Sequence, residues 1–418
     1  MKREIAALVN DWTTKRMKRN DPCGAIRALR SDSTGCDDQS QSPLFSVIPP
    51  EIRNDIFKYA LAEVETEDNQ YHPDTCFRRP GYLAPHRTYT DLLRTCKRIY
   101  SEAWHLPWAG AEHVFYFAWD GRKPQRTVEV EDVQDKLTVV HDSQGEQEID
   151  HIRIFAQLVY LEDGSRIRDV CNMDNFHPRS VTVTIRHTDF WNWEDDEPMR
   201  LAGTWMSWPT ELPNSVREFN LDLESIEQRK ASVDYLADNI AERWHVKRKD
   251  GSVLVPDRAE KSVMRWTGSS TWEGSRWISD EVRHLELDYY VRTVTFRPSA
   301  ARCDERSLAP TTINPDIEVP QDIAARTRLN PPNIHVYQLR EWGVPLDADA
   351  EVIRKIWAGE AEWTDTEDDE GDDRDDDGDD DEDDGDDGDN EDAEDGDDVD
   401  ENNDQSRNVV HFGAQGEE

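Results

Sequence analysis

The hydrophobic positions after residue 49 repeat every three to four residues. Ile52, Ile56 and Tyr59 fall on one stripe of a helix, and charged residues occupy the other side. Pro50 suits the first helical position, because the N–H that proline lacks would have no partner within the helix there. The pattern predicts a helix that begins at Pro50 and packs the Ile52 stripe against the protein core.

A second helical period runs through "DLLRTCKRIYSEAW", where Leu92 and Cys96 lie on one side. Thr88 and Asp91 have the spacing of a capping box, in which a hydroxyl and an acid three residues later pair with the first N–H groups of a helix. Pro107 cannot continue a helix. The sequence therefore predicts one amphipathic helix that begins after Thr88 and ends before Pro107.

Later segments have the composition of strands, in which apolar residues alternate with polar ones or run together as in "HVFYFAW". These segments are 113–119, 180–187, 215–224 and 281–296. Helical spacing returns in "SVDYLADNIAERW" and "DAEVIRKIWAGEAEW", and the pair Asp250-Gly251 marks a hairpin turn. The pattern predicts an α+β fold, with N-terminal helices packed on a mixed α/β body that contains antiparallel strands.

Acidic residues are concentrated near the end of the chain. Residues 365–404 hold 28 Asp or Glu and one Arg, and so carry −27 of the formal net charge of −42. A segment with this charge density and few apolar residues cannot offset the conformational entropy that folding costs. We expect residues 364–418 to form a disordered acidic tail. It acts either as a solvating brush or as a polyanion, which would make the chain an acidic nuclear or chaperone-like binder of basic proteins.

A basic cluster lies in the N-terminal segment 1–43, which ends in a polar linker. Lys15, Arg16, Lys18 and Arg19 have the spacing of a nuclear import signal, whose receptors present acidic pockets to an extended peptide. The alternative is an amphipathic surface helix. The cluster thus predicts either nuclear import or a helical surface element.

The cysteines and the hydropathy indicate the cellular compartment. The six Cys residues are far apart in the sequence, and the first residues lack the apolar run of a secretory signal. We therefore expect reduced thiols and a cytoplasmic or nuclear protein. No segment has the roughly 20 consecutive apolar residues of a membrane span, so we expect no membrane partner.

The sequence contains no common catalytic motif. It has neither a glycine-rich nucleotide-binding pattern nor the spaced His or Ser patterns of common hydrolases. Cys76, Cys96, His105 and His113 lie in one region, but their intervals do not match a zinc site. The fifteen Trp residues lack an accompanying basic stripe, so nucleic-acid binding has no electrostatic support. The sequence predicts a non-enzymatic protein without cofactor or metal.

Several stretches resemble a known family. The helical stretches "IPPEIRNDIFKYAL" and "LLRTCKRIYSEAW", and the later "IRIFAQL", "VTIRHTDFWNWE" and "LDYYVRTVTF", are similar to the F-box-like proteins of filamentous fungi, over about residues 44–297. The resemblance implies an F-box-like helical region at 44–119 and a mixed α/β body at 120–363. It also implies a substrate receptor of a cullin-type ubiquitin ligase, whose helices bind the adaptor subunit and whose body binds the substrate.

The same resemblance supplies candidate docking residues in the two helices. They are Pro50, Ile52, Ile56, Leu92 and Cys96. The alternative is that these apolar stripes pack only within the chain, since both uses need the same periodicity. A docking helix must also present apolar residues outside its core-facing stripe. Phe57 and Leu61, which lie off that stripe, are the candidates, so docking depends on their exposure.

Overall fold

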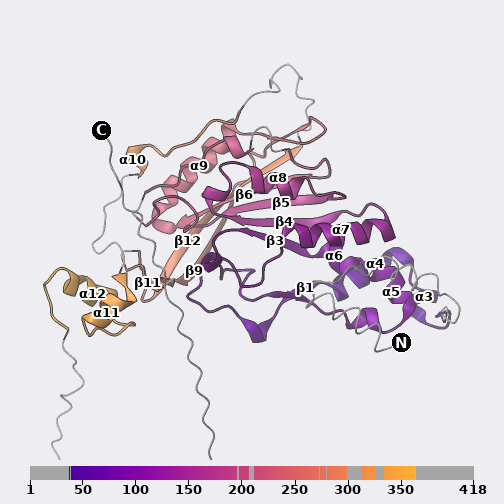
Figure 1. Ribbon diagram of the computed structural model, residues 1–418, viewed down its shortest axis with the longest axis horizontal. Coiled ribbons are helices and arrows are strands. Elements are labelled where there is room, and N and C mark those ends of the chain that lie inside the picture. Colours follow the sequence, from indigo (N-terminus) through magenta and orange to yellow (C-terminus); the bar gives the residue numbers. More distant parts are fainter. Residues whose placement is uncertain are drawn as a thin grey trace, which may run out of the picture. The chain divides into compact units, whose positions relative to one another are not determined.

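The computed structural model describes residues 37, 39–194, 197–206, 211–272, 274–278, 280–298, 313–324 and 334–363. The chain divides into two units, Met1–Thr364 and Asp365–Glu418, and all described residues belong to the first. The predicted import signal at residues 15–19 and the predicted acidic tail lie outside the described residues. Figure 1 shows the helices and strands of the first unit.

A mixed sheet is the main element of this unit. Within the described residues it has eight strands, in the order β3-β4-β5-β6-β12-β8-β7, with β9 also paired to β12. Strands β3 to β6 run parallel, whereas β12 is antiparallel to β6, β8 and β9. The strands are β3 (Glu112–Phe117), β4 (Ile149–Ala156), β5 (Pro178–Ile185), β6 (Glu218–Ile226), β7 (Val246–Lys247), β8 (Val253–Pro256), β9 (Ser262–Ser269) and β12 (Glu286–Pro298).

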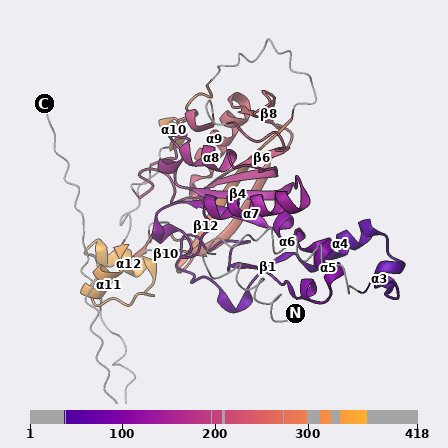
Figure 2. The same ribbon diagram turned by 45° about the vertical axis from the view of Figure 1, so that its right-hand side comes forward.

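Crossover connections explain the parallel half of the sheet. Helix α7 lies between β3 and β4 in the chain, and α8 lies between β4 and β5. Because such crossovers are right-handed, successive connections in one direction place their helices on the same face of the sheet. Figures 1 and 2 show α7 and α8 over the sheet. The three helices of this layer are α7 (Val130–Gln144), α8 (Ser165–Cys171) and α9 (Lys230–Arg243).

Apolar side chains at alternate strand positions form the main core under these helices. Ile154, Val183 and Leu221 are neighbours across β4, β5 and β6, and all three are fully buried. Leu137 of α7 and Leu236 of α9 belong to the same buried cluster. Burial of each such side chain stabilises the fold by about 1.5–3 kcal/mol. The apolar side chains on this face of the sheet are thus buried in the core beneath the helices.

Most of the predicted strands and helices are present. The predicted strands correspond to β3, β5, β6 and β12, and the helix predicted in "SVDYLADNIAERW" is α9. The predicted hairpin consists of β7 and β8, and Gly251 in its turn adopts φ +80°, which glycine reaches without strain. The α+β class is confirmed, and the main sheet contains both parallel and antiparallel strand pairs. Since β3 is part of it, the sheet crosses the boundary expected at residue 119.

The N-terminal helices have a hydrophobic cluster of their own. Its buried residues are Phe57, Leu61, Leu93, Ile99, Ala103 and Leu106. The helices are α3 (Pro43–Ser46), α4 (Pro50–Ala60), η2 (Asp91–Arg94), α5 (Lys97–Ala103) and α6 (Leu106–Gly110). Between α4 and η2 the chain forms β1 (Glu63–Glu65), η1 (Glu67–Asn69) and β2 (His86–Thr88). The helix predicted from Pro50 is confirmed as α4.

The second predicted helix is wrong in its extent. It is broken into η2 and α5, because Cys96 has an extended backbone at φ −151° and its Sγ accepts the Ile99 N–H at 3.4 Å. Thr88 belongs to β2 and caps no helix, so the predicted capping box is also wrong. Pro107 lies in the first turn of α6 instead of ending a helix, a position where its missing N–H costs nothing.

A further group of short elements packs around Ile278 and Ile353, which are both fully buried. Asp349 accepts the Glu351 N–H at 2.7 Å and so caps the predicted last helix, α12. No helix in the described part of the chain is long and apolar enough to span a bilayer. The remaining elements are β10 (Thr271–Trp272), β11 (Ser275–Arg276), β13 (Ile334–His335), α10 (Gln321–Ala324), α11 (Val336–Glu341), α12 (Ala350–Trp357), η3 (Asp120–Arg122), η4 (Leu158–Tyr160), η5 (Thr204–Met206) and η6 (Glu227–Arg229).

Candidate functional site

The inward face of α4 is not the one that the periodicity predicted. Phe57 and Leu61 are 1% and 2% exposed, whereas Ile52, Ile56 and Tyr59 are 51%, 40% and 85% exposed. The exposure of Phe57 and Leu61 on which docking was to depend is therefore absent, and the predicted inward orientation of the Ile52 stripe is wrong. The helix does carry a surplus apolar face, but on the opposite side from the expected one.

Arg53 explains this orientation of α4. It is only 5% exposed, and its Nε lies 3.0 Å from Glu102 Oε2 while its Nη1 donates to the Ile48 carbonyl at 2.8 Å. Its guanidinium also lies over the Phe45 ring. A buried arginine is stable when its charge is paired in this way. Arg53 and Phe57, four residues apart, therefore define the inward stripe.

The other candidate docking residues divide between the surface and the interior. Pro50 is exposed, whereas Leu92 and Cys96 are half-buried against the N-terminal hydrophobic cluster. The exposed apolar residues of α4 form one face, which we call the outer face: Ile52, Ile56 and Tyr59. The outer face is the first candidate functional site.

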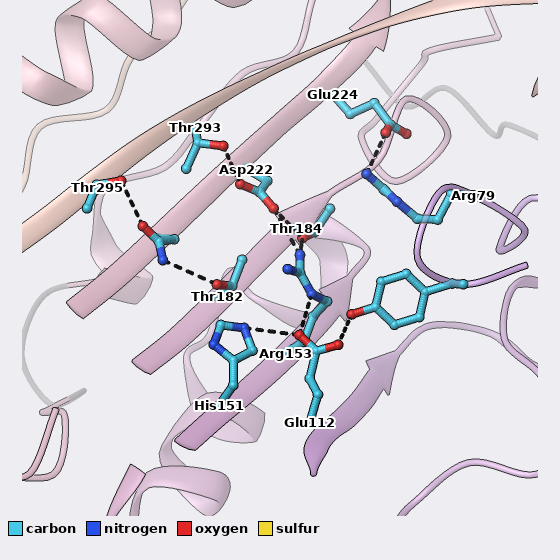
Figure 3. A network of polar contacts seen from close by, with 12 residues as sticks. Arg79, Glu112, His151, Arg153, Thr182, Thr184, Asp222, Glu224, Thr293 and Thr295 are labelled. Carbon is cyan, nitrogen blue, oxygen red and sulfur yellow. Dashed lines mark hydrogen bonds and ion pairs between the residues drawn. The ribbon is translucent and has the colours of Figure 1, made fainter. Parts of the chain in front are cut away.

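The sheet face opposite the helices is polar. Because side chains alternate along a strand, the positions between the apolar ones on β5 and β6 are Thr182, Thr184, Asn220 and Asp222. Thr184 is fully buried and Asp222 is 8% exposed, so these groups need hydrogen-bond partners within the protein. We call this surface the polar face, and Figure 3 shows the partners.

Arg153 of β4 lies at the centre of the polar face (Figure 3). Its Nε is 3.0 Å from Glu112 Oε1 on β3, and its Nη1 is 3.0 Å from Asp222 Oδ2 on β6. The same Nη1 donates to Thr184 Oγ1 on β5 at 3.0 Å. Thr293 of β12 donates to the other oxygen of Asp222 at 2.7 Å. One guanidinium thus connects the four parallel strands β3, β4, β5 and β6.

Glu112 is held as a carboxylate at the edge of this network. Burial alone would raise its pKa, but contacts with His151, Arg153 and the Tyr82 hydroxyl lower the pKa to about 2. Tyr82 comes from the segment between β1 and β2, and its ring packs edge-on against Phe155 at 5.0 Å between centroids. This segment therefore lies over the polar face and is bonded to it.

A pocket of about 80 Å³ lies at the carboxyl ends of β5 and β6. Arg186 and His187 follow β5 directly, and Glu224 stands near the end of β6. Arg79, from the segment between β1 and β2, also lines the pocket. Ligands of open α/β sheets bind outside the carboxyl ends of the strands. The pocket is therefore the second candidate functional site.

Two buried ion pairs fix the charged groups of the pocket. Arg79 Nη2 lies 2.9 Å from Glu224 Oε2, and the two side chains are 4% and 3% exposed. Arg186 donates to both oxygens of Asp189, at 2.6 and 3.0 Å. Burial raises the pKa of Glu224, although the Arg79 charge opposes this. Because each pair is held with little solvent access, the guanidinium groups keep fixed positions.

Aromatic rings complete the pocket on the antiparallel side. Trp266 stacks on Tyr289 with 4.1 Å between centroids and 10° between planes, and its Nε1 donates to Glu224 at 3.1 Å. Gly268 makes room for this stack, because a Cβ there would lie 2.6 Å from the Trp266 ring. Trp272, which also lines the pocket, stacks on Trp277 inside the protein. These aromatic residues are structural and form one wall.

The sequence did not reveal this pocket, although part of the signal was present. The polar residues at every second position of β5 and β6 indicated a polar sheet face, and Arg186 stood at the end of a predicted strand. Arg79 gave no signal, since it lies in a segment without periodicity. The described residues also contain no group of three or more His, Cys, Asp or Glu that could hold a metal ion.

Comparison with known proteins gives no family assignment. No protein-family model, curated protein or solved structure matches this chain.

Proposed function

We propose that this chain is a protein-interaction module that binds a partner through the outer face of α4. The observation that supports it is that α4 is apolar on two sides. Phe57 and Leu61 face the N-terminal cluster, while Ile52, Ile56 and Tyr59 are exposed. A contiguous apolar patch on a surface helix is typical of a protein-binding site. Covering it would contribute on the order of 1–2 kcal/mol for each side chain.

The fixed orientation of α4 strengthens this argument. The Arg53–Glu102 pair and the buried Phe57 ring hold the helix from within, so the outer face cannot rotate inward without breaking the ion pair of the buried Arg53. A preformed face binds a partner without the entropy cost of first ordering its own side chains and backbone. The outer face is thus presented to a partner in one orientation.

The partner that we propose is the adaptor subunit of a cullin-type ubiquitin ligase. The resemblance of "IPPEIRNDIFKYAL" and "LLRTCKRIYSEAW" to F-box-like helices supports this choice. In this proposal the chain is a substrate receptor, and the body that contains the sheet holds the substrate. The chain is then not itself an enzyme, in keeping with the absence of common catalytic motifs from its sequence.

A binding experiment with purified adaptor tests the proposal. The full-length protein is immobilised and the adaptor is titrated in low salt. The double variant Ile52→Ser/Ile56→Ser should weaken binding by at least tenfold, whereas Asp55→Ser, an exposed polar change on the same helix, should not. Circular dichroism confirms that both variants keep their helices. Failure of the native protein to bind adaptor, or unchanged binding by the double variant, would overturn the proposal.

The acidic tail supports a second candidate function. Its −27 charge within forty residues is a polyanion that would attract basic proteins. In this case deletion of residues 364–404 abolishes partner binding, and binding by the full chain falls steeply with salt. Adaptor binding through the outer face predicts the opposite result for the same deletion, because the tail takes no part in it.

A further inference from the structure

We propose that the pocket at the carboxyl ends of β5 and β6 binds a small oxyanion, such as the carboxylate or phosphate group of a ligand. This inference does not depend on partner binding by the outer face. It rests on three properties of the pocket: its size, its unpaired hydrogen-bond donors and its charge.

The size of the pocket fits a single small group. Its volume of about 80 Å³ exceeds the roughly 15 Å³ that one water needs, and is far below the roughly 300 Å³ of a drug-sized ligand site. Pro73 and Pro80 line it and are exposed, so the pocket is connected to the surface. It can therefore admit the charged end of a ligand and leave the rest of that ligand outside.

Three buried donors in the lining have no hydrogen-bond partner among the described residues. They are Arg79 Nη1, Thr188 Oγ1 and Trp272 Nε1, on residues that are 4%, 5% and 3% exposed. Arg79 uses Nη2 for Glu224, which leaves Nη1 unpaired. Buried donors without partners are rare, because each one destabilises the fold. All three residues line the pocket, so they mark a wall that is poor in acceptors and rich in donors.

The charge of the pocket selects an anion among possible acceptors. Its lining contains Arg78, Arg79 and Arg186 but one carboxylate, Glu224. Arg186 is paired with Asp189, and Arg79 with Glu224, which leaves the positive charge of Arg78 in excess. Hydrogen bonds from a guanidinium to an anionic oxygen are about twice as strong as neutral ones. A cation would find few acceptors here, since Glu224 already accepts from Arg79 and Trp266.

Titration of the full-length protein with two simple anions tests the inference. Sodium phosphate and sodium acetate are titrated separately at constant ionic strength, with isothermal calorimetry and thermal unfolding as readouts. We expect saturable binding of at least one anion and a rise in Tm, because a ligand that binds only the folded state stabilises it. Preference for phosphate or for acetate then tells which group the pocket takes.

Two conservative variants assign the binding to this pocket. Thr188→Val removes one unpaired donor and keeps the shape of the side chain, so it should fold and bind the anion about tenfold more weakly. Trp272→Phe removes the indole N–H but leaves a smaller ring, so circular dichroism first checks its fold, and it should then show the same loss of anion binding. Ser180→Ala is the matched control, because Ser180 Oγ is also buried and unpaired but does not line the pocket. It should bind normally. Absence of saturable binding of either anion, or equal binding by all three variants, would overturn the inference.

Discussion

Arg153 Nη1 lies 3.0 Å from Asp222 Oδ2, although their strands, β4 and β6, are separated by β5. Arg153 reaches over Thr184 of β5 and donates to its hydroxyl on the way. The backbone ladder connects only adjacent strands, whereas this contact joins strands two positions apart. The polar face therefore adds a second set of connections across the parallel half of the sheet.

Replacing Arg153 should destabilise the protein strongly. Arg153→Met keeps the length of the side chain but leaves Glu112 and Asp222 without their shared positive partner. Removing one member of a largely buried charge pair typically costs about 3 kcal/mol, since the other charge stays buried. Urea unfolding followed by Trp fluorescence measures the loss. Arg217→Met, which removes an exposed pair with Glu148, should change stability by less than about 1 kcal/mol. Equal losses would contradict the role of Arg153.

His113 should make the protein less stable in mild acid. Burial lowers the pKa of His113 to about 4, from an ordinary value of 6.5. The hydrogen bond between its Nε2 and the Trp108 carbonyl, at 2.9 Å, opposes this shift, and the nearby Lys136 adds to it. The unfolded chain therefore binds a proton on this histidine more readily than the native protein does. Stability should fall as the pH drops from about 6.5 to about 4, by at most about 3 kcal/mol.

Comparison with His113→Gln isolates this effect. Glutamine can still donate to the Trp108 carbonyl but does not titrate. The difference in unfolding free energy between the native protein and the variant should therefore shrink as the pH falls from 7 to 4. Glu112 has a pKa of about 2, so its own contribution is lost only below about pH 4.5 and is common to both proteins. A difference that stays constant over this range would refute the prediction.

Cys171 should resist alkylation in the native protein. It is 3% exposed, and burial raises its pKa to about 12, so both access and thiolate formation are suppressed. Cys96, which is half-buried, serves as the comparison in the same chain. Iodoacetamide treatment at pH 8, followed by mass spectrometry of the peptides, should label Cys96 well before Cys171. In urea both should react at similar rates. Equal native rates would contradict the burial of Cys171.

The two faces of α4 should respond differently to truncation. Phe57→Ala removes a fully buried ring and should destabilise the protein by about 3–5 kcal/mol. Ile56→Ala, one residue earlier on the outer face, should cost less than about 1 kcal/mol because Ile56 is 40% exposed. Thermal unfolding of the two variants measures both values. A larger loss of stability for Ile56→Ala than for Phe57→Ala would instead indicate that the Ile52 stripe faces the core, as the periodicity predicted.

The position of α4 was predictable from the sequence, but its inward face was not. Helical spacing and Pro50 fix where the helix begins. The same helical spacing allows two inward stripes, one through Ile52 and one through Phe57. Which of them faces the core depends on Arg53, a charged residue that a hydrophobic pattern assigns to the exposed side. Its partner Glu102 lies in α5, so only the folded structure shows that its charge is paired. Similarly, the helical spacing places Cys96 inside a helix, whereas in the structure Cys96 caps the start of α5.

Neither the pairing of the strands nor the pocket could be predicted from the sequence, for a related reason. Alternation predicts that β5 and β6 are strands, but their parallel pairing depends on how the intervening segments cross the sheet. Arg79 and Glu224 come from segments far apart in the chain and meet only when that sheet is complete. Contacts of this kind leave no local pattern.

Strand β12 also determines when during synthesis the sheet can close. It is the last of the eight strands to leave the ribosome, yet it lies between β6 on one side and β8 and β9 on the other. A nascent chain that ends before Glu286 has the edges of β6 and β9 without their partner, and unpaired strand edges associate with other chains. Truncated products of this length should aggregate or be held by chaperones, whereas chains that extend past Pro298 can complete the sheet.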